Sequence, residues 1–278
     1  MRYHKLHNSS ILIETHGSQW GVGDSGLQIV VCIELYLDEF WSKAGRMKRL
    51  IRGLHEFQTN YFNTHRELFE LLSQGQQPRV LFITCSDSRI DPNLITQTEP
   101  GEMFIIRNAG NIIPPYGATN GGEGAAVEYA VHALGIQDII VCGHSHCGAM
   151  KGLLKINKLA EDMPAVYEWL KHAEATRRII KEHYQEYEGE DLLNAAIQEN
   201  VLTQLENLRT YPVVQSRLKN NQIQLHGWIY EIETGQVMEY NPAVGQFMPP
   251  HTMFSRAAWI TPEQQERIYK GSNTVSQS

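Results

Sequence analysis

Three short apolar segments, interspersed with stretches of helical periodicity, constrain the fold of this chain more than any other feature. The apolar segments cover residues 80–84, 103–106 and 139–142, and helical patterning occupies 62–72 and 124–134. Strands separated by helical segments usually form a parallel sheet with crossover helices. The sequence therefore predicts an α/β fold, a mainly parallel β-sheet flanked by helices, with a helical arm before it and a tail after it.

The second half of the chain continues this pattern. Apolar residues recur at helical spacing over 166–173 and again over 193–208, which predicts two further helices. Residues 223–232 alternate well enough for a strand, and Thr234-Gly235 provides a turn into a partner strand at 237–240. The sheet is therefore expected to end in a strand pair.

Composition divides the chain into three parts. A length of 278 residues with 42% hydrophobic content is enough for one sizeable α/β domain. Residues 1–46 show no clear hydrophobic periodicity of a helix or a strand, so we expect them to form a leader that is dispensable for folding and activity. The domain proper is expected at 47–240. Residues 241–278 are expected to form an extension, loosely ordered up to 260, with a short helix at 261–271 that begins in a capping box.

Charge and hydropathy exclude several functions. The formal net charge of −7 disfavours nucleic acid as a partner, because phosphate binding needs a basic surface. There is no apolar run of some 18 residues, so no membrane-spanning helix is expected. The apolar stretch 27–37 is interrupted by Glu34 and makes a poor signal peptide. We therefore expect a cytoplasmic protein, in which cysteines near a histidine more often bind metal than form disulfides.

Metal-binding side chains follow two of the predicted strands. Cys85 ends the first strand, and His144 follows the third, with Cys147 three residues later. The carboxyl ends of parallel strands meet at one edge of a sheet, where ligands usually bind. Thiolate and imidazole are ligands that zinc favours, and a catalytic zinc site keeps a fourth position open. The sequence therefore predicts a zinc site formed by Cys85, His144 and Cys147.

A carboxylate and a guanidinium accompany the first ligand. Asp87 can accept a proton from metal-bound water or bind the zinc itself. Arg89 can hold Asp87 in a bidentate pair and keep it ionised. His146, between the other two ligands, is open to three interpretations: an exposed loop residue, a competing ligand or a proton carrier. We expect Asp87 and Arg89 to be the catalytic pair.

These motifs occur together with Pro-Gly-Glu-x-Phe at 100–104, Arg-Asn-Ala-Gly-Asn at 107–111 and Gly-Ala-Ala-x-Glu-Tyr-Ala at 124–130. Over roughly residues 47–240 the combination resembles the β-class carbonic anhydrases. The resemblance implies reversible hydration of carbon dioxide to bicarbonate on zinc. It also implies a homodimer or higher homo-oligomer, with the sites near the dimer interface.

By the positions of these motifs, the chain also resembles the plant-type branch of that family. This resemblance implies a carbon dioxide pocket formed by Gln76, Phe104 and Tyr129, in which the amide binds a substrate oxygen and the rings supply an apolar wall. Members whose aspartate closes the site by binding zinc often have Trp three residues before the first cysteine. Phe82 occupies that position here, which favours the open form.

Residues 91–97, residues 143–154 and the extension beyond Tyr240 resemble the carboxysomal enzymes of cyanobacteria. This implies residence in a protein shell, supply of carbon dioxide to the carbon-fixing enzyme, and a scaffold protein as partner through 261–271. A solvated tail is an equally open interpretation. Two other functions stay open: hydrolysis of carbon disulfide or carbonyl sulfide, and a non-catalytic scaffold adaptor with structural zinc. The Asp87–Arg89 pair and a three-ligand site argue against the adaptor.

Overall fold

The computed structural model describes residues 4–5, 11–12, 43–118 and 121–250. The chain divides into two compact units, residues 1–74 and 75–278. Most of the leader and the whole helix expected at 261–271 lie outside the described residues. The helices before residue 74, which we expected to belong to the domain that starts at Met47, fall in the first unit.

The first unit contains a pair of short strands and a series of helices. The strands β1 and β2 are antiparallel, and the elements are β1 (His4–Lys5), β2 (Ile11–Leu12), α2 (Lys43–Glu56), a π-helical turn (Phe57–Tyr61), α3 (Phe62–Thr64) and α4 (Arg66–Leu72). Helix α2 begins four residues before Met47, so helical structure precedes the change in composition. Its residues Met47, Leu50, Ile51 and Leu54 recur at helical spacing and are 57–66% exposed.

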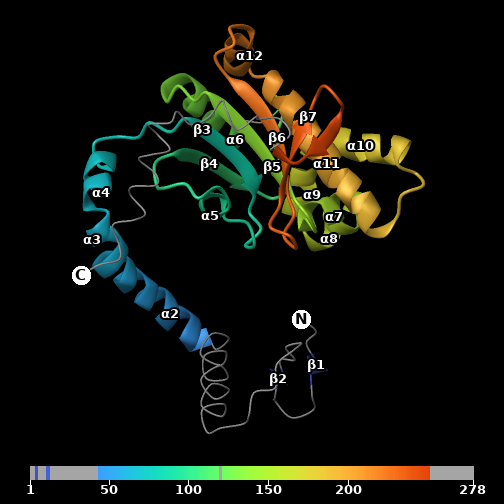
Figure 1. Ribbon diagram of the computed structural model, residues 1–278. Coiled ribbons are helices and arrows are strands. Elements are labelled where there is room, and N and C mark those ends of the chain that lie inside the picture. The colour runs from blue at the N-terminus through green and yellow to red at the C-terminus, as the bar shows by residue number, and fades with distance from the viewer. Residues whose placement is uncertain (1–3, 6–10, 13–42, 119–120, 251–278) are drawn as a thin grey trace. The chain divides into compact units, whose positions relative to one another are not determined.

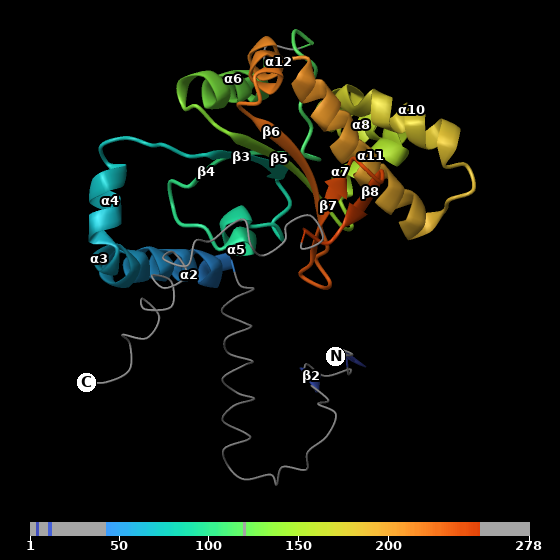
Figure 2. The same ribbon diagram turned by 45° about the horizontal axis from the view of Figure 1, so that its top comes forward.

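The second unit is built on a six-stranded sheet with the strand order β4-β3-β5-β6-β7-β8 (Figure 1; β8 is labelled in Figure 2). Neighbouring strands among the first four are parallel, and the last two are antiparallel additions at one edge. The strands are β3 (Val80–Cys85), β4 (Met103–Asn108), β5 (Asp138–His144), β6 (Gln224–Tyr230), β7 (Val237–Asn241) and β8 (Gln246–Met248). The predicted α/β fold with a mainly parallel sheet is confirmed.

Helices connect and cover these strands. They are α5 (Pro92–Thr96), α6 (Gly122–Glu128) with a π-helical turn (Tyr129–Ala133), α7 (Gly148–Leu154), α8 (Leu159–Asp162), α9 (Pro164–Leu170), α10 (Glu174–His183), α11 (Gly189–Arg209) and α12 (Pro212–Lys219). Helix α11 packs directly on β5 and β6 (Figure 2). A Cβ on Gly143 would lie 2.9 Å from Val201 of α11, so glycine allows this close approach.

The sheet continues beyond Tyr240, where we had expected the domain to end. Strand β8 pairs with β7, and the rings of Tyr240 and Phe247 lie 5.3 Å apart. A tight turn joins the two strands: the Gly245 amide donates to the Asn241 carbonyl at 2.9 Å, and Gly245 has a φ of +68°. Residues 246–248 are therefore a strand and not part of a loosely ordered tail.

Side chains alternate between the two faces of the sheet. Leu81, Ile83 and Val141 belong to the large core beneath the helices, and Phe82 and Ile140 belong to a smaller cluster on the other face. This alternation follows from the two-residue repeat of a strand. Both faces of the central strands are buried, which is typical of parallel sheets and explains their continuous apolar sequences.

A partly buried cluster of ionisable side chains joins three strands on one face. The ring of His226 on β6 contacts Glu239 of β7 through Nδ1 at 2.9 Å and Asp138 of β5 through Nε2 at 3.0 Å. Burial by itself would lower the pKa of His226, but the hydrogen bonds to Glu239 and Asp138 outweigh it and raise the pKa. A protonated imidazole donates from both nitrogens, so the folded state favours the charged form.

We expect His226→Gln to destabilise the protein more at about pH 6 than at about pH 9. A raised folded-state pKa gives stability that is fully present below the unfolded value and is lost as the pH rises through the folded value. Glutamine does not titrate and therefore lacks this dependence. The measurement is the free energy of unfolding in urea for both proteins across this range. A difference that stays constant with pH would contradict the assignment.

Candidate metal centre

The three predicted metal ligands meet at the carboxyl edge of the sheet. Strands β3 and β5 are parallel neighbours, so Cys85 and His144, which end them, lie side by side. Cys147 precedes the first turn of α7. Within the described parts of the chain, this is the one group of metal-binding side chains whose ligand atoms all lie within 4.8 Å of one another, and all three residues are buried.

The chemistry of this group fits zinc. The carbonyl of Ser145 can only accept, so His144 donates to it from Nδ1 at 2.9 Å, and the proton of the neutral ring resides there. The Nε2 atom therefore keeps its lone pair, and it is buried without a hydrogen-bond partner among the described residues. Two sulfur atoms and one such nitrogen form a zinc ligand set that leaves the fourth position open.

The surroundings of Cys85 favour its thiolate. The hydrogen bond from the Cys147 thiol lowers the pKa of Cys85 most. Burial raises this pKa, and the hydrogen bond from the Gly110 amide lowers it, so that the net shift is well below the ordinary value. The Gly110 amide donates to Cys85 Sγ at 3.4 Å. The thiolate is the form that binds metal, so Cys85 is prepared for an ion, whereas the hydrogen bond to Cys85 and burial raise the pKa of Cys147, which must lose its proton when the ion binds.

Asp87 and Arg89 form the bidentate pair that the sequence predicted. Arg89 Nε donates to Oδ1 at 2.9 Å and Nη2 donates to Oδ2 at 2.8 Å, and the Arg89 amide donates to Oδ1 at 3.0 Å. The Arg89 side chain holds the pKa of Asp87 well below its usual range. Oδ2 of Asp87 lies 3.9 Å from His144 Nε2, so an ionised carboxylate stands beside the metal ligands.

Arg107 of β4 holds the loop that carries this pair, a role that sequence reasoning missed. Its Nε donates to the Cys85 carbonyl at 3.1 Å, and its Nη2 donates to the Asp87 carbonyl at 2.8 Å. The motif containing Arg107 was recognisable in the sequence, but only the register of β3 with β4 brings the side chain to this loop.

His146 does not join the metal ligands. It has a φ of +55°, and its ring nitrogens contact the carboxylates of Glu190, at 3.0 Å, and Glu233. Its carbonyl accepts from Arg89 Nη2 at 3.4 Å. Both ring nitrogens are thus engaged away from Cys85 and its partners, which argues against a competing ligand.

Within one chain, the expected carbon dioxide pocket lies apart from these ligands. The rings of Phe104 and Tyr129 are 6.0 Å apart, so the structure brings these two residues together. However, Phe104 pairs with Leu81, four residues before Cys85 in β3, which corresponds to about 13 Å along the strand. Gln76 is exposed and precedes β3, at the same distant end.

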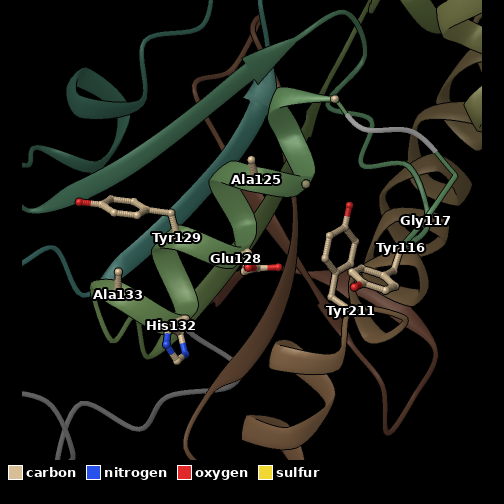
Figure 3. A pocket seen from close by; sticks show the side chains of 10 residues that line it. Tyr116, Gly117, Ala125, Glu128, Tyr129, His132, Ala133 and Tyr211 are labelled. Carbon is tan, nitrogen blue, oxygen red and sulfur yellow. The ribbon is translucent and has the colours of Figure 1, made fainter.

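A hollow of about 590 Å³ lies along α6. Figure 3 shows Tyr129 on one side of this helix, and Glu128 facing Tyr211 and Tyr116 on the other. Tyr116 and Tyr211 stack edge to face at 5.6 Å, and the Tyr211 hydroxyl donates to the Pro114 carbonyl at 2.9 Å. The surface next to Tyr129 is therefore concave.

The carbonic anhydrase family model matches residues 80–237, a range that contains all three ligands, Asp87 and Arg89. The chain belongs to this family. It is 59% identical over 230 residues to a carbonic anhydrase of Synechocystis sp., and the match covers 83% of each chain. The structure is also similar to that of the solved β-carbonic anhydrase CcaA, with a TM-score of 0.73 and 63% sequence identity. This match covers 74% of this chain and all of the CcaA chain.

A more distant structure agrees in fold. A tetrameric β-carbonic anhydrase of Sordaria macrospora matches with a TM-score of 0.64 at 26% identity, over 70% of this chain and 96% of that one. The protein is thus a β-class carbonic anhydrase, a carbonate dehydratase with the Cys-His-Cys zinc site of that class. These matches favour this activity over the sulfide-releasing hydrolase and the non-catalytic adaptor.

We expect Cys147→Ser to lose zinc and hydration activity together, because a serine hydroxyl is a poor replacement for a thiolate ligand. The measurement is zinc per chain after dialysis against a chelator, alongside stopped-flow hydration. Cys142→Ala is the matched control, since that buried thiol stands outside the ligand group and donates only to the Gly143 carbonyl. A Cys147→Ser protein that keeps its full zinc content would contradict the assignment.

Proposed function

We propose that Asp87 and Arg89 orient the water that attacks carbon dioxide. Bound zinc supplies the Lewis acidity that provides hydroxide at neutral pH. Asp87 Oδ2 faces His144 and accepts a hydrogen bond from the attacking group. Because Arg89 keeps the pKa of Asp87 low, the carboxylate stays ionised, and it acts as an acceptor that fixes the orientation of the nucleophile rather than as a store for its proton.

The proton released in the reaction leaves through the exposed side of this pair. The side chain of Arg89 is 46% exposed and that of Asp87 is 16% exposed, whereas His144 is fully buried. Buffer in solvent therefore reaches the site past Arg89. The pairing of Asp87 with Arg89 also supports the open form of the site, in which the carboxylate stays off the metal.

We propose that a second copy of the chain completes the substrate pocket with its own Gln76, Phe104 and Tyr129. The separation of about 13 Å along the strand keeps these residues from their own zinc ligands. Two observations support an assembly of at least two copies. The exposed apolar face of α2 needs a surface to cover it, and the hollow along α6 lies next to Tyr129. The relative from Sordaria macrospora is a tetramer.

We further propose that the enzyme works in the cytoplasm inside carboxysomes, where it supplies carbon dioxide to the carbon-fixing enzyme. The motifs shared with the cyanobacterial carboxysomal enzymes and the identity to the Synechocystis protein support this. None of the described helices is both long and apolar enough to cross a membrane. The segment proposed to contact a scaffold protein, 261–271, lies outside the described residues.

The role of Asp87 is tested by Asp87→Asn. We expect this variant to keep its zinc and to lose about 100-fold or more in hydration rate, because the amide weakens the acceptor and the charged pair with Arg89. The matched control is Asp91→Asn, which makes the same change four residues away. Asp91 caps α5 by accepting from the Leu94 amide, a role that asparagine also fills. Normal activity of Asp87→Asn would remove Asp87 from the mechanism.

The shared pocket is tested by complementation. Cys147→Ser and Tyr129→Ala chains carrying different tags are co-expressed, and mixed assemblies are isolated by two successive affinity steps. If the pocket serves the partner's zinc, one site in each mixed dimer is intact, and activity returns to about half the wild-type value. Each variant alone is expected to be nearly inactive. Mixed assemblies that form but stay inactive would show that the pocket acts within one chain.

A further inference from the structure

We propose that Trp169 is a positioning residue for the metal centre. Its indole N–H holds the peptide group between Ala109 and Gly110 in the orientation that points the Gly110 N–H at Cys85 Sγ. The proposal rests on the zinc site itself. It is independent of the roles proposed for Asp87 and for a second copy of the chain.

Two hydrogen bonds share one peptide group. Trp169 Nε1 donates to the Ala109 carbonyl at 2.8 Å, and the Gly110 amide donates to Cys85 Sγ at 3.4 Å. In a planar trans peptide the C=O and the following N–H point in opposite directions. A donor that fixes the carbonyl therefore also fixes the direction of the N–H.

The loop around this peptide has little freedom to rearrange. Gly110 has a φ of +84°, and a Cβ there would lie 3.0 Å from both the Ala149 Cβ and the Met150 Cε of α7. The next carbonyl, that of Gly110, accepts from the buried Asn200 Nδ2 of α11 at 2.9 Å. With these neighbours fixed, rotation of the 109–110 peptide is the remaining way to lose the bond to sulfur, and Trp169 opposes it.

The bond to sulfur affects how the cysteine binds metal. An N–H donor withdraws electron density from a thiolate, so the sulfur donates less to the bound ion and the ion stays a stronger Lewis acid. Hydrogen bonds arranged in series polarise one another, so the indole strengthens the donor that reaches Cys85. Loss of such supporting partners typically costs about 10- to 100-fold in metal affinity or activity.

The test is Trp169→Phe, which keeps an aromatic ring and removes the N–H. Its matched control is Trp228→Phe, since the buried Nε1 of Trp228 has no hydrogen-bond partner in the described part of the chain. The readouts are the sulfur-to-metal charge-transfer band of the cobalt-substituted protein and zinc affinity measured by chelator competition. We expect Trp169→Phe to shift the band to lower energy, because the sulfur loses part of its N–H donor and becomes more electron-rich. We also expect zinc to bind about 10-fold more weakly, because the freed 109–110 peptide no longer holds the loop against Cys85 and this loss outweighs the stronger sulfur donor. Trp228→Phe is expected to match the wild type.

An isosteric variant separates the hydrogen bond from packing. Replacement of Trp169 with β-(3-benzothienyl)alanine keeps the shape of the bicyclic ring and substitutes sulfur for the N–H, so it decides the question even if Trp169→Phe does not fold. A wild-type band and wild-type zinc affinity in the isosteric variant would overturn the role of Trp169. A wild-type protein that binds neither zinc nor cobalt would overturn the metal site as well, so the two failures are distinguishable.

Discussion

The parallel pairing of β3 with β5 is the constraint on which the rest of the structure depends. It sets Thr84 beside Cys142, and the buried Thr84 hydroxyl donates to the Cys142 carbonyl at 2.9 Å. From this register, Cys85 and His144 emerge together at one edge of the sheet. Helix α11 packs closely against β5 at Gly143, on the face of the sheet that it covers. The geometry of the metal site is therefore set by the pairing of the central strands.

Charge at this edge is balanced by donors from outside the ligand set. Two thiols and a carboxylate share a small buried region, where like charges would normally oppose ionisation. The Arg89 guanidinium balances the negative charge of Asp87 by donating to both carboxylate oxygens, and the Gly110 amide donates to the sulfur of Cys85. Arg107 joins the carbonyls on both sides of the loop between them. The result is a site in which the Cys85 thiolate and the Asp87 carboxylate are both favoured, while Cys147 keeps its proton and His144 is neutral.

The same sheet that builds the metal site keeps the expected substrate pocket away from it. Phe104 and Tyr129 lie near the opposite ends of the strands, and the fixed register of β3 with β4 keeps them there, since a shift by one residue would turn each side chain to the other face. The second copy of the chain that we propose would resolve this separation without any change in the fold. Assembly would at the same time cover apolar surface that the described structure leaves exposed on α2.

The sequence by itself determined the alternation of strands and helices, the three zinc ligands and the Asp87–Arg89 pair. These depend on hydrophobic periodicity and on spacings of two or three residues, which local geometry converts directly into contacts. Only the tertiary structure decided that helical structure starts at Lys43, that the sheet extends to β8, and that Trp169 reaches Ala109 across 60 residues of chain. Contacts of this second kind depend on strand register and on the packing of distant helices, which no local pattern specifies.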